Sequence, residues 1–152
     1  MTYNRDKKTA DAPVISAAAS QTGSTLIAKA NRLRILIVED SSDSAEILER
    51  ALTLLGMRVE IARNGTEALT VAKGFKPDAV LLDIGLPGID GIHVAKELKK
   101  QTDSPLIIAV TGRSAPDDIL RSMDAGIDHH LVKPLVILSL VEILHAIVHG
   151  RR

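Results

Sequence analysis

Five polar residues stand at or just beyond the ends of short, fully apolar runs: Glu39, Asp40, Asp83, Thr111 and Lys133. Such runs, bounded by turn residues, are typical of buried parallel strands. Because the carboxyl ends of parallel strands meet at one edge of an open sheet, we expect the five side chains to converge there. Three carboxylates in one place repel each other, and a hard cation such as Mg²⁺ would relieve this repulsion. Thr111 and Lys133 would then be donors for an anion such as phosphate.

Each of these residues also has an ordinary interpretation. Glu39 and Asp40 could cap a helix or remain as surface charges, and Lys133 could form a simple ion pair with Asp83. The convergence of acids, hydroxyl and lysine on one edge favours the metal and phosphate interpretation over these alternatives.

The elements that must position these residues alternate regularly along the chain. Strands are expected at 34–38, 57–62, 79–82, 105–110 and 129–132, and helices at 43–55, 64–73, 92–101, 117–125 and 135–149. Gly56, Gly74 and Gly126 are expected to end three of these helices. Five strand–helix pairs predict an α/β fold, with a five-stranded parallel sheet in the flavodoxin-like order 2-1-3-4-5 and helices on both faces.

The chain divides into one domain and two short ends. A length of 152 residues suits a single domain with a proper core. Residues 1–32 contain too few large apolar side chains to pack, so we expect a flexible N-terminal tail before a domain at 33–149. Residues 150–152 form a short C-terminal tail, and no output domain is expected.

Composition disfavours several classes of function. The net charge is zero with a pI near 7.0, and one Tyr and one Phe leave no stacking platform, so no nucleic-acid partner is expected. No apolar stretch is long enough to cross a bilayer, which predicts no membrane association. Cysteine is absent, and the weakly apolar stretch at 12–19 is a poor secretion signal, so the expected location is the cytoplasm.

Four segments carry a resemblance to a known family: ILIVEDS, VLLDIGLPGIDG, IIAVTG and DAGIDHHLVKPL. Together with their spacing, they make residues 33–149 resemble the receiver domain of two-component response regulators. The resemblance implies that Asp83 is the phosphoacceptor and that it binds Mg²⁺ together with Asp40 and the carbonyl group of Gly85. By the same resemblance, Glu39 assists the metal through water.

The remaining site residues and the partners also follow from the resemblance. Thr111 and Lys133 would contact the phosphoryl group, and the bond before Pro134 would be cis. The donor would be a histidine kinase or a histidine phosphotransfer protein, and the phosphorylated form would signal to a downstream protein target. Such a stand-alone receiver assists its own phosphorylation and dephosphorylation but is not an enzyme that turns over an external substrate.

One position departs from the family pattern and leaves a rival function open. Receivers commonly carry Tyr or Phe three residues before the lysine, where this chain has His130. The chain could therefore be a non-switching pseudo-receiver that acts only as an interaction module. Alternatively, His130 could replace the aromatic switch and make signalling sensitive to pH, since an imidazole titrates near ~6.5.

Two other classes of protein fit the sequence less well. An aspartate-nucleophile phosphatase would have a second acid two residues after the nucleophile, where this chain has Gly85. A flavodoxin-like cofactor binder would hold a phosphate near the first loop, where Glu39 and Asp40 would repel it.

The last predicted helix has an unusually wide apolar arc. Over residues 135–149, the polar residues form one narrow stripe: Ser139, Glu142, His145 and His149. A helix covering one sheet face needs a narrower arc, so part of the apolar surface is expected to be exposed. The residues expected there are Val136, Leu140, Ile143 and Ile147. This surface predicts a homodimer or partner interface, and the alternative is a deeply packed terminal helix.

Overall fold

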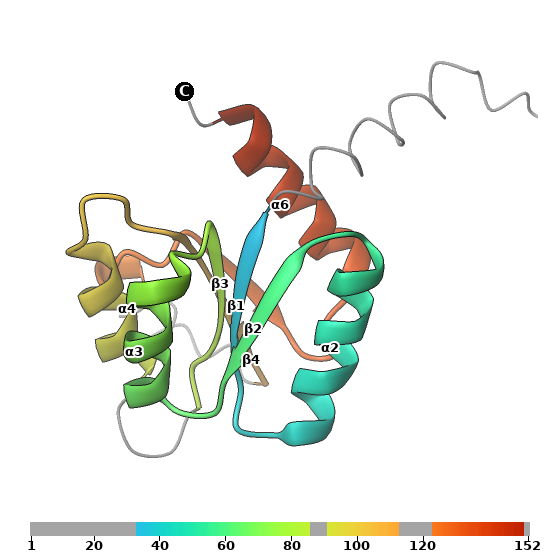
Figure 1. Cartoon of the computed structure of the whole chain (residues 1–152), viewed down its shortest axis with the longest axis horizontal. Coiled ribbons are helices and arrows are strands. Elements are labelled where there is room, and N and C mark those ends of the chain that lie inside the picture. The colour runs from blue at the N-terminus through green and yellow to red at the C-terminus, as the bar shows by residue number, and fades with distance from the viewer. Residues whose placement is uncertain (1–32, 86–90, 113–122, 151–152) are drawn as a thin grey trace, which may run out of the picture.

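The computed structural model describes residues 33–85, 91–112 and 123–150. The elements are β1 (Arg34–Val38), α2 (Ser42–Leu54), β2 (Arg58–Ala62), α3 (Gly65–Phe75), β3 (Ala79–Asp83), α4 (Gly91–Lys99), β4 (Leu106–Thr111), β5 (His129–Val132) and α6 (Ile137–Gly150). Strands and helices alternate from β1 to β4, and a helix follows β5, as the sequence predicted (Figure 1).

The five strands form one parallel sheet in the order β2-β1-β3-β4-β5, which confirms the predicted topology. Strand β1 lies between β2 and β3: Ile37 pairs with Ile61 on β2 and with Leu81 on β3. The chain moves outward from β1 to β2 and then returns to β3 on the other side of β1. The carboxyl ends of β1 and β3 are therefore neighbours at the switch point, where α/β sheets bind ligands.

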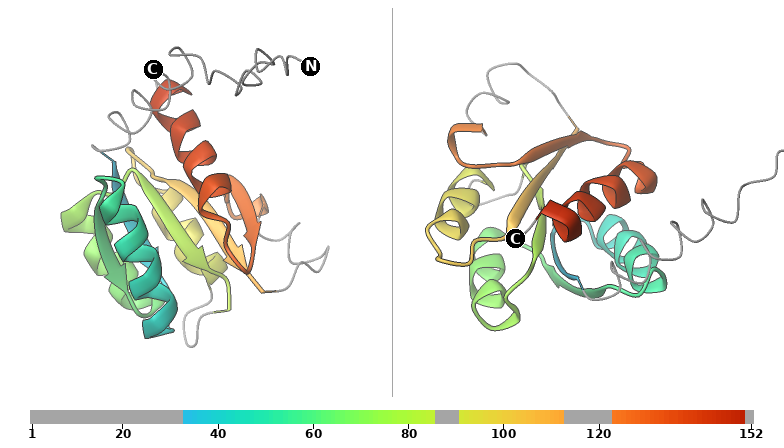
Figure 2. Two further views of the ribbon diagram at one scale, coloured as in Figure 1. Left: turned by 90° about the vertical axis from the view of Figure 1, so that its right-hand side faces the viewer. Right: turned by 90° about the horizontal axis from the view of Figure 1, so that it is seen from above.

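Successive side chains along each strand point to opposite faces of the sheet and fill two separate hydrophobic cores. Ile35 and Ile37 face the core under α2 and α6, whereas Leu36 and Val38 face the core under α3 and α4. The view from above shows these helix pairs on opposite sides of the sheet (Figure 2). Because both faces are covered, the central strands are apolar at nearly every position, as in other buried parallel sheets.

Helix ends follow local backbone chemistry with one correction. Helix α2 is capped by the Ser41 side chain, and Gly56 follows it with φ of 88°, as expected for a C-terminal stop. The prediction that α3 ends before Gly74 is wrong, because the helix continues to Phe75, whose ring packs against the core. Lys76, with φ of 51°, provides the left-handed cap instead.

Two further expectations meet the structure only in part. The helix predicted at 117–125 falls mostly outside the described residues, although Gly126 has φ of 88°, as expected for a residue that ends a helix. Helix α6 begins at Ile137, later than the predicted position 135, and the carbonyl of Val136 accepts the hydrogen bond from Leu140 N. Across the described residues, no helix is both long and apolar enough to span a membrane.

Candidate functional site

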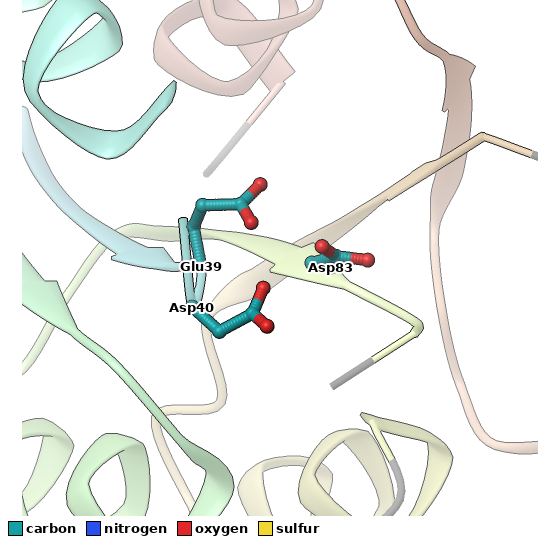
Figure 3. Close-up of side chains that lie close together, drawn as sticks. All are labelled: Glu39, Asp40 and Asp83. Carbon is teal, nitrogen blue, oxygen red and sulfur yellow. The ribbon is translucent and has the colours of Figure 1, made fainter. Parts of the chain in front are cut away.

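Three carboxylates meet at the switch point between β1 and β3. Glu39 and Asp40 directly follow β1, and Asp83 is the last residue of β3 (Figure 3). One carboxylate oxygen from each lies within 4.8 Å of the other two. The sequence therefore correctly predicted that these acids converge, because parallel pairing of β1 with β3 fixes both strand ends at the same level.

Both carboxylate oxygens of Glu39 accept hydrogen bonds. This residue is 8% exposed and is the only buried charged residue in the described part of the chain. Its Oε1 accepts a hydrogen bond of 3.2 Å from Ser41 N, and its Oε2 accepts one of 2.9 Å from Lys133 Nζ. The resemblance implied only a water-mediated metal role for Glu39, and its contact with Lys133 was not predicted.

Lys133 links the acids of the two strands. Its Nζ also donates to Asp83 Oδ2 at 3.1 Å, while Asp83 Oδ1 accepts from Gly85 N at 2.9 Å. Asp40 is exposed, and its carboxylate has no hydrogen bond or ion pair within the ranges that the structure describes. Asp40 is therefore the acid of the cluster most available to a further ligand.

Burial and mutual contact shift the pKa values of the central pair. Burial raises the pKa of Glu39, and the charge of Asp83 adds to this, although hydrogen bonds from Lys133 and Ser41 oppose it. For Lys133, burial alone would lower the pKa, but hydrogen bonds to Glu39 and Asp83 outweigh burial and raise it. The ammonium group therefore keeps its proton at neutral pH. For Glu39, burial and the neighbouring charge of Asp83 make the ionised carboxylate less favourable than it would be in water.

The donor set fits a hard divalent cation. Three carboxylates face one ammonium group, so the cluster has an excess of negative charge. Oxygen ligands of this kind suit Mg²⁺, which binds through one or two carboxylates and keeps several waters. Asp40 can supply such a ligand without losing a described partner, whereas both oxygens of Glu39 and of Asp83 already accept hydrogen bonds.

Thr111 and Lys133 reach the same edge from β4 and β5. Thr111 ends β4, the neighbour of β3, and its carbonyl accepts a hydrogen bond of 2.8 Å from Lys133 N. The Lys133–Pro134 peptide bond is cis, as the sequence resemblance implied. The structure thus brings the predicted hydroxyl, lysine and three acids to one edge of the sheet.

A glycine allows the chain to return closely beneath Asp83. A Cβ added at Gly91 would lie 3.0 Å from the Asp83 carbonyl oxygen and 3.1 Å from Ile84 Cα. Both are backbone atoms, so a side chain here would push α4 away from the end of β3. At Gly85, an added Cβ would lie 3.5 Å from Asp83 Oδ1, an ordinary contact distance, so this position does not require glycine for space.

Comparison with known proteins identifies the family. A family model described as the response regulator receiver domain matches residues 35–145. This chain belongs to that family. The match spans β1 through most of α6 and includes every residue of the acid cluster, so the geometry described above is that of a receiver domain.

Curated relatives extend the receiver domain with further sequence. The transcriptional regulatory protein PrrA of Mycobacterium leprae is 39% identical over 118 residues, which cover 78% of this chain and 51% of the relative. The response regulator MprA of Mycobacterium avium is 35% identical over 115 residues, which cover 76% of this chain and 50% of the relative. This chain spans about half the length of these relatives.

Solved structures show the same fold. A two-component response regulator from Clostridium difficile has a TM-score of 0.74 and 28% identity, covering 78% of this chain and 97% of its own. A receiver domain protein from Methanospirillum hungatei has a TM-score of 0.73 and 28% identity, covering 78% of this chain and 94% of its own. These likenesses agree with the predicted receiver fold.

His130 lies on β5, near the edge of the sheet that carries the acid cluster. It pairs with Ala109 on β4, and Thr111 is two residues further along β4, so all three share one face of the sheet. Burial lowers the pKa of His130, and the nearby charge of His129 lowers it further. The position suits the proposed switch, which remains a prediction.

The expected exposed surface of the last helix is partly wrong. Leu140 is 0% and Ile147 is 7% exposed, because they pack against the sheet with Leu144 in one line along α6. Ile143 is only partly buried, and Val136, just before the helix, is 57% exposed. The sequence also missed Leu138, which is 74% exposed.

A groove beside the site was also missed by the sequence reasoning. It is a cavity of about 330 Å³ between α2 and the segment that joins β5 to α6. The residues that line it are Glu39, Ser44, Ile47, Leu48, Ala51, Val110, Lys133, Pro134, Leu135 and Ile137. The available signal was Ile47, an apolar residue among the polar positions of α2, which is 69% exposed.

Proposed function

We propose that this receiver domain accepts a phosphoryl group on Asp83 from a phosphohistidine. The donor is a histidine kinase or a histidine phosphotransfer protein, and the phosphorylated form signals to a downstream protein by contact. The observation that carries the proposal is the Asp83 carboxylate, bound by Lys133 at 3.1 Å beside two further acids. A structural ion pair would need one acid, not three.

The residues have distinct roles in the transfer. An oxygen of Asp83 attacks phosphorus, the phosphorus–nitrogen bond breaks, and the imidazole of the donor leaves with the electron pair. Lys133 offsets charge on the phosphoryl oxygens, the Thr111 hydroxyl donates to one of them, and Glu39 holds the Lys133 ammonium in place. The domain assists this modification of itself without turning over an external product.

The metal requirement rests on the acid cluster. Mg²⁺ bound by Asp40, Asp83 and the carbonyl of Gly85, with Glu39 in support through water, would neutralise phosphoryl oxygens. Asp40 is the key protein ligand in this proposal, because its carboxylate has no competing partner among the described residues.

The proposed setting is the cytoplasm, with protein partners only. The relative PrrA is named a transcriptional regulatory protein, but it is about twice as long as the matched segment. For this chain we propose contacts with proteins only, and none with nucleic acid or membrane. A homodimer would use Val136, Leu138 and Ile143 around the start of α6, since Leu140 and Ile147 are buried.

Phosphorylation of the purified chain tests this function. Incubation with Mg²⁺ and acetyl phosphate, followed by intact mass measurement, should show one added phosphoryl group. Asp83→Asn should abolish it, whereas Asp103→Asn, at an exposed aspartate near the other end of the sheet, should not.

Two results would contradict the proposal. Full, Mg²⁺-dependent labelling of Asp83→Asn would exclude this residue as the acceptor. A folded wild-type protein that takes up no phosphoryl group from acetyl phosphate or phosphoramidate would instead support the non-switching interaction module.

A further inference from the structure

The groove beside the site is mainly apolar and open to solvent. Its walls are Ile47, Leu48 and Ala51 of α2 on one side, and Leu135 and Ile137 on the other. Ile47 is 69% exposed, although a side chain of this kind is normally buried. A cavity of about 330 Å³ is large enough to accept two or three apolar side chains from another segment.

One end of the groove is formed by the phosphorylation machinery itself. Glu39 and Lys133 line it together with Val110, which precedes Thr111 at the carboxyl end of β4. Whatever occupies the groove therefore lies against the lysine that contacts Asp83. An occupant would limit the approach of a bulky phosphodonor to that carboxylate.

The charge distribution of the chain favours an occupant from its own N-terminal segment. Residues 1–32 contain five basic and two acidic residues, whereas residues 33–152 contain 14 basic and 17 acidic residues. The acidic excess includes the carboxylate cluster and two exposed residues near the start of α2, Asp43 and Glu46. A basic segment is thus attracted to this edge of the domain.

The same segment carries apolar residues at a suitable distance. Leu26 and Ile27 stand seven and six residues before Leu33, which precedes β1 at the opposite end of the sheet from the groove. Strand β1 has five residues and spans roughly 17 Å, whereas six or seven extended residues span about 20–25 Å. Leu26 and Ile27 can therefore reach the groove without moving the domain.

We propose that Leu26 and Ile27 of this chain dock into the groove between α2 and the β5–α6 segment. Leu26 and Ile27 fill the apolar walls, and the basic residues of the N-terminal segment face the acids near α2. Because the segment is tethered to the domain, docking is intramolecular and needs no second molecule. The docked segment competes with protein phosphodonors for access to Asp83, and this consequence rests on the proposed function.

Absence of cysteine makes the docking directly measurable on the full chain. A nitroxide attached through Ala28→Cys should broaden the methyl NMR signals of Ile47, Leu135 and Ile137. Methyl signals of Val94 and Leu98, which α4 buries against the other face of the sheet, should be spared.

A matched variant separates docking from simple tethering. Leu26→Ser with Ile27→Ser, in the Ala28→Cys background, keeps the length and charge of the segment but removes its apolar contacts. Broadening at Ile47 should fall at least several-fold in this variant. Uniform weak broadening over the surface, or broadening that persists in the double variant, would overturn the proposal.

Two further arms identify the occupant and separate the two proposals. In one control, a spin-labelled chain without isotope is mixed with an isotope-enriched chain that has no spin label. This mixture should show no broadening of the methyl signals. Broadening there would mean that a second copy of the chain occupies the groove. Acetyl phosphate is small and should label the wild-type chain and the Leu26→Ser, Ile27→Ser variant at equal rates. Loss of labelling in both would contradict the proposed function, while the broadening data would still decide whether the segment docks.

Discussion

The two ends of the sheet use carboxylates in opposite ways. At the amino end, Asp128 precedes β5, and its Oδ2 accepts hydrogen bonds from Ile107 N at 2.8 Å and from Lys99 Nζ at 2.7 Å. At the carboxyl end, Glu39, Asp40 and Asp83 share one lysine. The first arrangement has one acid for one cation, and the second has two acids in excess.

The same amino-end pattern recurs one strand pair away. Asp78 precedes β3, its Oδ2 accepts from Arg34 N at 2.8 Å, and the Arg34 side chain lies 3.6 Å away. Each of these aspartates therefore accepts a hydrogen bond from the backbone at the start of a neighbouring strand and pairs with one basic side chain. Acids at the amino end stabilise the fold, whereas the unmatched charge at the carboxyl end is available for a ligand.

The largest expected effect comes from removing the unmatched acid. Asp40→Ala should lower Mg²⁺ affinity and the rate of phosphorylation by at least about tenfold, because few protein oxygens remain for a cation that dehydrates reluctantly. The free energy of unfolding should not fall, since this carboxylate has no partner in the described structure. Metal titration, acetyl phosphate labelling and urea unfolding measure the three quantities, and unchanged metal binding would contradict the assignment.

A matched acid should show the reverse behaviour. Asp128→Ala removes the acceptor of Ile107 N–H and leaves Lys99 without its carboxylate, so it should lower the free energy of unfolding by about 2 kcal/mol. The folded fraction should still take up one phosphoryl group at Asp83. Urea unfolding gives the first quantity and intact mass the second. Normal stability together with lost labelling would mean that the two ends are not separable.

The contrast also shows what the sequence could and could not predict. The sheet order and the meeting of Asp83 with Glu39 and Asp40 followed from apolar runs and parallel pairing, which are local signals. The contact between Glu39 and Lys133 joins residues 94 positions apart, and nothing local distinguishes it from a metal-ligand role. The sequence therefore predicted which residues lie together but not which of their atoms form hydrogen bonds.

The burial of individual residues on the last helix was the other property that the sequence could not predict. Periodicity showed that the last helix is apolar around most of its circumference, but not which part of this arc the sheet would cover. Leu140 proved to be buried, whereas Leu138, two residues away, is 74% exposed. Only the position of α6 on the sheet decides between two residues of the same type.

A smaller effect should appear in the pH dependence of stability at the carboxyl end. The pKa of Glu39 is raised above its ordinary value of 4.5, first by burial and then by Asp83, so the folded state binds a proton here more readily than the unfolded chain. The free energy of unfolding should therefore fall as pH rises from about 4.5 through the raised value. Glu39→Gln should flatten this fall in urea unfolding of the metal-free protein. Identical pH profiles for the two proteins would mean that Glu39 carries no such strain.

The smallest expected effect is at His130, which shares a sheet face with Thr111. Its pKa is lowered from 6.5 by burial and by His129, so the folded state favours the neutral ring. Stability should therefore decrease as pH falls below 6.5 toward the lowered value, because the unfolded chain binds the proton first. His130→Tyr should remove this decrease, while His93→Gln, at an exposed histidine of α4, should retain it.

The same residue should also link pH to signalling. A neutral ring can turn inward beneath Thr111 when the hydroxyl engages a phosphoryl group, whereas a charged ring resists burial. Binding of the phosphorylated chain to its downstream partner should weaken as pH falls toward 6, and His130→Tyr should abolish that dependence. NMR of the imidazole before and after phosphorylation checks the movement directly. A ring that keeps the same environment in both states would exclude His130 as the switch and leave the surface around the start of α6 to carry the signal.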